Sequence, residues 1–202
     1  MSLHFLPYCN HRNFSLKHKD GFGLIELMVS ISIMLIVSSV ILARQSAFNG
    51  AVLLRSQLYE VALAVREVQL SAVSAESNGS GSFGSVQGIY FDTVTSNNAS
   101  YITFHDIDGD FFYDSNEQFG KQGLIDKRFE VRAIRAIGGT INGTGVAVVF
   151  KRPNFDAQFY SSTGKISASS IEVDISKRGN TGTTNDVVRT LEITATGQIT
   201  VK

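Results

Sequence analysis

The pattern of hydrophobic and polar residues divides the chain into an apolar N-terminal run and a longer, alternating C-terminal region. Residues 22–43, called the span below, are almost wholly apolar, and Glu26 is the only ionisable residue among them. At a rise of about 1.5 Å per residue, the span forms a helix of roughly 33 Å, which crosses the hydrocarbon core of a bilayer. A carboxylate there costs about 3 kcal/mol or more. Because a plain membrane anchor has no use for such a residue, we expect Glu26 to have a function.

Helical periodicity continues beyond the span. Apolar residues recur at spacings of four and three and form one stripe. We predict that this stripe packs on the body of the domain and that one helix runs from Phe22 to about Ala75. The only prolines are Pro7 and Pro153, so none interrupts this helix. The stripe consists of Leu54, Leu58, Val61, Val65, Val68 and Ala72.

The rest of the chain alternates with a period of two. A segment rich in glycine and serine, 74–88, predicts a loop, and short runs with β-branched and aromatic residues follow it. A tight hairpin at 194–197 leads into the last run. Six or seven strands predict a small antiparallel sheet or a two-sheet sandwich against the helix, which is an α+β fold. The predicted strands are Gly88–Phe91, Ser100–His105, Phe129–Ile137, Val146–Lys151, Ser170–Ser176, Val187–Thr194 and Gln198–Val201.

The small residue next to the span lies on its N-terminal side. A secretory signal peptide has its small-residue cleavage site after the apolar run, whereas Gly21 precedes it. Cleavage after Gly21 would remove a hydrophilic leader and leave the apolar helix on the mature protein. The basic residues before the span predict a cytoplasmic leader and an extracytoplasmic C-terminal part.

Composition fits one globular domain in addition to the membrane helix. The 202 residues include 18 basic and 18 acidic ones, and removal of a leader with three cations and one acid leaves 15 basic and 17 acidic residues. Bulk charge therefore gives no support to nucleic-acid binding. The only cysteine is Cys9, in the leader, so we expect no disulfide in the mature protein.

The start of the span resembles the class III signal of type IV pilins and pseudopilins, in which G-F-T-L-I-E-L is usual. The resemblance implies cleavage between Gly21 and Phe22 by a prepilin peptidase, and then N-methylation of Phe22. It also implies assembly with other pilin or pseudopilin subunits on an inner-membrane platform. Gly23 departs from the pattern, since threonine is commonest there. The matching residues are Gly21, Phe22, Leu24, Ile25, Glu26 and Leu27.

The layout after the span resembles the minor pilins and pseudopilins of the FimT and type II secretion H-subunit kind, whose post-membrane helix has an A-x-x-x-R-x-x-Q-like register. The resemblance implies a cleaved leader over 1–21, a span over 22–43, a helix continuing into the head over 44–75 and a β-rich head over 76–202. Many pilins also close a disulfide near the C-terminus, and this chain departs from them in that respect.

Candidate metal chemistry lies in the stretch Asp106–Glu117, DIDGDFFYDSNE, called the acidic loop below. Carboxylates stand at its first, third, fifth, ninth and twelfth places, the spacing with which an EF-hand loop wraps Ca²⁺. Phe111 occupies the sixth place, which is normally glycine, and no helix pair flanks the stretch. A looser calcium loop between strands and a solvated hairpin with inward-facing aromatic residues are both open. The candidate ligands are Asp106, Asp108, Asp110, Asp114 and Glu117.

Other chemistry is scarce. Without the leader, His105 is the only histidine, so neither a Cys/His pair nor a zinc cluster can form. The sequence contains no P-loop, dinucleotide fingerprint or nucleophile elbow. We therefore expect no enzymatic activity. The basic pairs 151–152 and 177–178 could contact DNA, which some minor pilins of this kind bind. We interpret them instead as solvated loop charges, since two short pairs give phosphates only a weak, salt-sensitive contact.

Two functions of different classes fit the sequence. In the first, the protein is a filament subunit, stored in the cytoplasmic membrane and then pulled into a type IV pilus or a pseudopilus. Glu26 would pair with the terminal amine of a neighbouring subunit, so that each charge relieves the desolvation of the other. In the second, the protein is a membrane-anchored extracytoplasmic enzyme or binding domain with an uncleaved leader. The lack of a catalytic cluster favours the first.

Overall fold

Helix α1 (Leu24–Val73) is the longest element of the protein, with 50 residues. The computed structural model describes residues 21, 23–74, 86–179 and 187–202. Contacts group the chain into two compact units, Met1–Ser46 and Ala47–Lys202, and α1 contributes residues to both. The prediction of one long helix is confirmed over the described residues, and both predicted end residues, Phe22 and Ala75, lie outside them.

The first unit contributes the apolar part of α1. By length and composition this helix can cross a membrane, since its most apolar window has a mean hydropathy of 2.4. The large apolar side chains from Leu24 to Leu42 are exposed. Two hydroxyls within the span are satisfied by the helix itself, since Ser30 Oγ donates to Glu26 O and Ser32 Oγ donates to Met28 O, each at 2.8 Å. Such pairing hides a hydroxyl from lipid.

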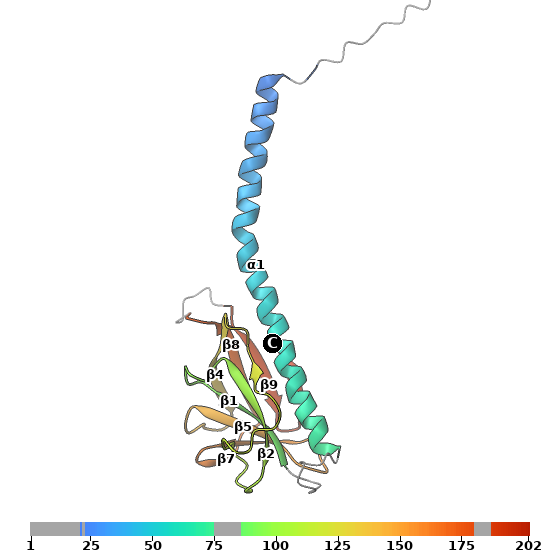
Figure 1. Cartoon of the computed structure of the whole chain (residues 1–202), viewed down its shortest axis with the longest axis vertical. Helices are drawn as coiled ribbons and strands as arrows, with labels where there is room; N and C mark the ends of the chain where they lie inside the picture. Colours follow the sequence, from blue (N-terminus) through green and yellow to red (C-terminus); the bar gives the residue numbers. More distant parts are fainter. Residues whose placement is uncertain (1–20, 22, 75–85, 180–186) are drawn as a thin grey trace, which may run out of the picture. The chain divides into compact units, whose positions relative to one another are not determined.

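The second unit contains two antiparallel sheets and the remainder of α1 (Figure 1). In the six-stranded sheet the order is β3-β2-β1-β5-β6-β7, and its strands are β1 (Val86–Asp92), β2 (Ser100–Asp106), β3 (Gly123–Leu124), β5 (Gly145–Phe150), β6 (Ala157–Ser161) and β7 (Gly164–Ile166). In the four-stranded sheet the order is β10-β9-β8-β4, and its strands are β4 (Phe129–Ile137), β8 (Ser170–Lys177), β9 (Arg189–Thr194) and β10 (Ile199–Val201).

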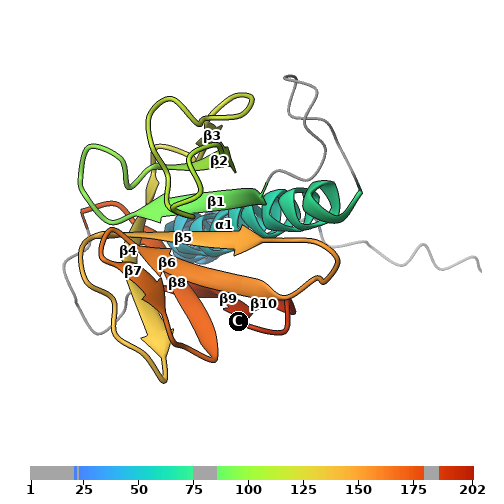
Figure 2. The ribbon, with the colours of Figure 1, turned by 90° about the horizontal axis from the view of Figure 1, so that it is seen from below.

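One hydrophobic core joins α1 to both sheets. The head half of α1, residues 47–73, runs alongside β1 and β5 (Figure 2). All six residues of the predicted stripe are buried and belong to the core, as do Val148 of the six-stranded sheet and Val173 of the four-stranded sheet. The prediction that the stripe packs on the body of the domain is therefore confirmed. Burial of each such aliphatic side chain contributes about 1.5–3 kcal/mol before conformational entropy is counted.

Seven predicted strands are confirmed, with bounds that differ by up to two residues. The prediction missed β3, β6 and β7, which have only two, five and three residues. Residues 75–85 of the predicted loop lie outside the described residues, and β1 begins at Val86, so the last three residues of the predicted loop, 86–88, belong to this strand. The predicted hairpin is confirmed, because Gly197 N donates to Thr194 O at 2.9 Å and Gly197 has a positive φ of 80°.

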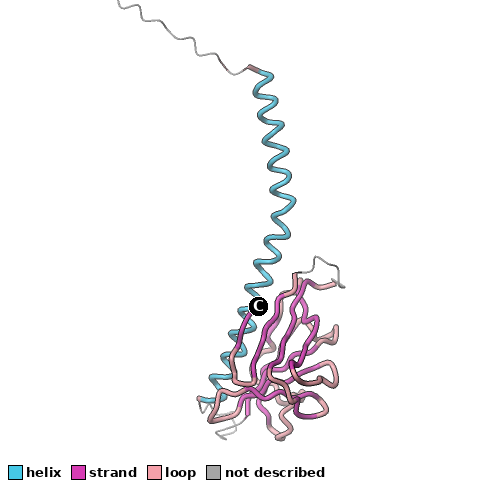
Figure 3. Tube along the Cα trace, turned by 180° about the vertical axis from the view of Figure 1, so that it is seen from behind, coloured by secondary structure: helices cyan, strands magenta, loops and turns pink. Residues whose placement is uncertain are grey.

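The buried side-chain amide of Gln69 connects α1 to the β-rich part of the head through hydrogen bonds. Its Nε2 donates to Phe155 O at 2.7 Å and to Gly197 O at 3.0 Å, and its Oε1 accepts from Arg66 Nη1. A Cβ on Gly197 would lie 2.0 Å from Phe155 O and 2.6 Å from Gln69 Nε2, so the close approach requires glycine. The strands and the helix can be followed as a Cα trace in Figure 3.

Candidate functional site

The first candidate site is the start of α1. Gly21 and Gly23 are exposed, and the first helical hydrogen bond runs from Leu27 N to Gly23 O at 3.1 Å. Glu26 lies in the first turn of α1 and is exposed, in a position where the helix dipole favours a carboxylate. Among the described residues, no ion pair involves Glu26. Phe22, the predicted methylation site, lies outside the described residues.

The second candidate site, the acidic loop, closes a hairpin at the end of β2. His105 N donates to Glu117 O at 3.0 Å, Phe119 N donates to Thr103 O at 2.8 Å, and Phe104 and Gln118 form an isolated bridge. These bonds fix the two ends of the loop side by side. The loop is therefore held by strand pairing at its base and not by flanking helices.

The five predicted carboxylates fall into two overlapping groups. One ligand atom from each of Asp106, Asp108 and Glu117 lies within 4.8 Å of the other two, and the same holds for Asp108, Asp110 and Asp114. Asp106 and Glu117 are buried, at 8% and 2% exposure, and the other three are exposed. Asp108 thus links a buried group to an exposed group. Calcium prefers such oxygen ligands.

Some carboxylate oxygens of this cluster already accept hydrogen bonds from backbone amides. Glu117 accepts from Ile107 N at 2.7 Å and from Asp114 N at 3.2 Å, while Asp106 accepts from Gly109 N at 2.7 Å. Burial raises the pKa of Asp106 above its usual value, and the neighbouring Asp108 and Asp110 add to that rise while backbone hydrogen bonds oppose it. Ionised Asp106 therefore costs folding free energy near neutral pH.

The sixth place of the acidic loop has the backbone conformation of a glycine although it carries an aromatic side chain. Phe111 has φ 64°, and no other described residue except glycine has a positive φ. Its ring stacks on Tyr160 with centroids 5.0 Å apart, and Phe112 and Tyr113 contact Tyr90 at 5.4 and 5.3 Å. These aromatic residues pack on a second small core, formed by Phe104, Ala147, Val149 and Tyr160. The predicted inward packing of residues 111–113 is confirmed.

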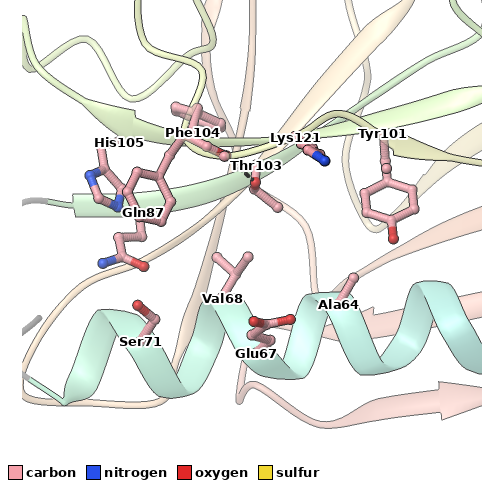
Figure 4. Close-up of a pocket in the computed structure, with 13 residues that line it drawn as sticks. Ala64, Glu67, Val68, Ser71, Gln87, Tyr101, Thr103, Phe104, His105 and Lys121 are labelled. Carbon is pink, nitrogen blue, oxygen red and sulfur yellow. Dashed lines mark hydrogen bonds between the residues drawn. The ribbon is translucent and has the colours of Figure 1, made fainter. Parts of the chain in front are cut away.

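His105 lies beside a cavity between α1 and β2. It is 5% exposed, and its ring stacks on Phe119 with centroids 4.0 Å apart. The cavity has a volume of about 290 Å³, and Glu67, Thr103 and Lys121 also line it (Figure 4). No sequence signal predicted this cavity, because its walls come from α1, β1, β2 and the segment after the acidic loop.

The two basic pairs lie in different settings. Lys151 Nζ lies 5.8 Å from the centroid of the Phe111 ring, beside the acidic loop. Lys177 ends β8, and Arg178 Nε lies 3.7 Å from Glu130. Arg178 therefore has a carboxylate partner, which agrees with a solvated loop charge and weakens the case for a phosphate contact.

Comparison with known families bears on the first site. Residues 16–42 match the family model of the prokaryotic N-terminal methylation motif. The match includes Gly21, Phe22 and Glu26 and ends one residue before the end of the span. The chain therefore carries the class III signal of type IV pilins at the head of a long helix that is followed by a β-sheet head. No curated protein and no solved structure matches the chain.

Proposed function

We propose that the protein is a structural subunit of a type IV pilus or of a type II secretion-like pseudopilus. The observation that carries this proposal is the methylation motif at 16–42, at the start of the apolar half of α1. A prepilin peptidase cleaves after Gly21 and methylates the new amino group of Phe22. Residues 22–43 then remain in the membrane, the segment 44–75 contains the rest of α1 up to Val73, and the head, 76–202, is extracytoplasmic.

Glu26 acts in assembly in this proposal. An exposed carboxylate on an apolar helix is costly in lipid, and the terminal amine of a neighbouring subunit offers an opposite charge. Once the two charges pair, each offsets part of the desolvation of the other, so the correctly placed neighbour is favoured over lipid. An inner-membrane platform then moves the helices from the bilayer into the filament core.

Recovery in sheared surface filaments tests this proposal. A pilus subunit is recovered with the filaments in amounts that distinguish a major from a minor role, and a pseudopilus subunit is recovered there when the secretion system is overexpressed. A membrane-anchored enzyme or binding domain, the alternative function, stays in the membrane fraction. If the protein is found only in the membrane fraction, in a host whose pili are intact and whose secretion system is overexpressed, the filament proposal is contradicted.

We also propose that the acidic loop binds Ca²⁺ with Asp106, Asp108, Asp110, Asp114 and Glu117 as its ligands. Two observations support this: the two overlapping carboxylate groups, and the glycine-like φ of Phe111 at the sixth place. The second accounts for the departure from the EF-hand pattern, because the turn needs that φ and the aromatic packing of Phe111 stabilises it. The carboxylates repel one another in the absence of the ion, and a bound Ca²⁺ attracts all of them and so offsets that repulsion.

The calcium proposal predicts a rise in melting temperature. The fragment 47–202, which contains the core of the second unit, is expected to melt several degrees higher in millimolar Ca²⁺ than in chelator. Binding to the folded state alone stabilises it by about 2.7 kcal/mol at a hundredfold excess over Kd. Asp108→Ala should abolish the difference, because Asp108 belongs to both groups. Asp156→Ala, outside the acidic loop, should keep it. A melting temperature indifferent to Ca²⁺ would leave the loop as a solvated hairpin.

A further inference from the structure

The head half of α1 has a second apolar face, on the side away from the core. Val52, Tyr59, Leu63 and Leu70 are exposed by 51%, 46%, 69% and 52%. At about 100° per residue these four side chains lie within an arc of roughly 40°, and the buried stripe is centred about 160° away. We call this set the second apolar face. Large apolar side chains that gather exposed on one face of a helix indicate an interaction site.

Two arginines border the second apolar face. Arg55 and Arg66 are exposed, and within the described part of the chain neither forms an ion pair. Arg55 Nη2 donates to Tyr59 Oη at 3.3 Å, and its Cζ lies 5.7 Å from the centroid of the Tyr59 ring. Tyr59 thus holds a guanidinium at the edge of the face, and its remaining N–H groups suit a carboxylate.

Grooves lie beside the same face. One, of about 320 Å³, is lined by Tyr59, Leu63, Arg66 and the start of β10. The other, of about 220 Å³, is lined by Arg55, Tyr59 and the residues Arg189, Val201 and Lys202. Lys202 is already paired with Glu172 and Glu192, at 3.0 Å each. Side chains of a docked helix can enter such grooves, as knobs enter holes in helix packing.

We propose that the second apolar face docks the span of a second copy of this chain, in parallel and with Glu26 of that copy opposite Arg55. This inference rests on the proposed function and adds to it a partner segment and a register. The docked copy is displaced by the difference between positions 55 and 26, which is 29 residues or about 43 Å along the helix.

Helix length and charge select this register. With this displacement the partner's residues 24–44 lie against residues 53–73 of the first copy. The head half of α1, which ends at Val73, is therefore long enough to cover the partner's span. Glu26 is the only carboxylate of the span, and Arg55 is the cation that it meets. Glu26 against Arg66 instead would place half of the span beyond the end of α1. Charge complementarity of this kind fixes register.

The same register gives complementary side-chain sizes. The largest side chain of the face, Tyr59, lies opposite Ser30, a small residue whose hydroxyl already donates within its own helix. Met34 and Ile41, exposed by 70% and 61%, are apolar partners of suitable size. The spacings of four and three on both helices are those of parallel pairs that cross at about 20°. The opposed pairs are Arg55 with Glu26, Tyr59 with Ser30, Leu63 with Met34, Arg66 with Val37, and Leu70 with Ile41.

Cysteine cross-linking in the native host tests the register, since the mature chain has no cysteine of its own. The full chain with Met34→Cys and Leu63→Cys is treated with a mild oxidant or a short bismaleimide. We expect a ladder of covalent multimers, because each copy joins the next. Ile41→Cys with Leu70→Cys has the same displacement and should give a second ladder. The matched control, Met34→Cys with Tyr59→Cys, is one helical turn out of register and should give little product.

A charge reversal tests the ion pair. Arg55→Glu should lower the amount of chain in sheared filaments about tenfold or more, because like charges then oppose each other. Arg66→Glu, on the same face but opposite Val37, should have a much smaller effect.

The outcomes separate the register from the proposed function. Wild-type filaments without a ladder from either cysteine pair, or with an equal ladder from the control, overturn the docking register and leave the filament proposal intact. Equal losses from the two charge reversals also overturn it. If the wild-type chain never enters filaments, both fail.

Discussion

The variant Glu26→Leu is expected to remain in the membrane and to be absent from filaments. Leucine makes the span more apolar, so insertion is retained and improves by about 3 kcal/mol. The variant lacks the negative charge that pairs with the terminal amine of a neighbour and with Arg55 of a docked copy. Loss of both pairs removes the preference for a correctly placed subunit over lipid. The measurement is the ratio of protein in sheared filaments to protein in membranes, in the native host.

Glu26→Asp is the matched control for this prediction, because it keeps the charge and shortens the side chain by one methylene. It should retain part of the assembly that Glu26→Leu loses. Glu26→Ala should behave as Glu26→Leu does, since the effect comes from the missing charge and not from side-chain size. Normal incorporation of either neutral variant would remove the assembly role of Glu26.

Leu58→Ala is expected to lower the free energy of unfolding of the fragment 47–202 by about 2–5 kcal/mol. Leu58 is 0% exposed and belongs to the core that joins α1 to both sheets. The truncation leaves a cavity between a helix and two sheets, and these elements cannot close on it without moving together. Urea unfolding followed by circular dichroism measures the loss.

Leu63→Ala provides a control on the same helix with the same chemical change. Leu63 is 69% exposed on the second apolar face, so its truncation should change the unfolding free energy by no more than about 0.5 kcal/mol. The same substitution should reduce filament incorporation, whereas its effect on folding is small. Similar losses of stability from the two substitutions would contradict the assignment of the two faces.

Much of the fold could be predicted because its periodicity is local. The stripe from Leu54 to Ala72 specifies a buried helix face by spacing alone, and alternation as in 171–175 specifies a strand. β3 and β7 have too few residues for any alternation to be recognised. The sequence left a single sheet and a two-sheet sandwich open, and the structure has two sheets. The sequence could not decide between them, because strand order depends on contacts between residues far apart in the sequence.

For the candidate sites as well, the sequence predicted local spacing but not contacts between distant residues. The spacing of the five carboxylates was visible in the sequence, and the structure brings them together in two groups. The glycine-like φ of Phe111 was not visible, because it depends on packing against Tyr160 in β6. The role of Gln69 could not be predicted either, since its acceptors are carbonyls of residues 155 and 197. Polar contacts between distant residues leave no periodic signal.

The central claim is that this chain is processed as a prepilin, and the N-terminus of the membrane-extracted protein tests it most directly. Intact-mass and peptide mass spectrometry are applied to protein from the native host, with a strain that lacks prepilin peptidase as the control. The account predicts a chain that begins at Phe22 with a methylated amino group, and an unprocessed chain in the control strain. A chain that retains its leader in the native host, or one cut beyond Ala43, would contradict it.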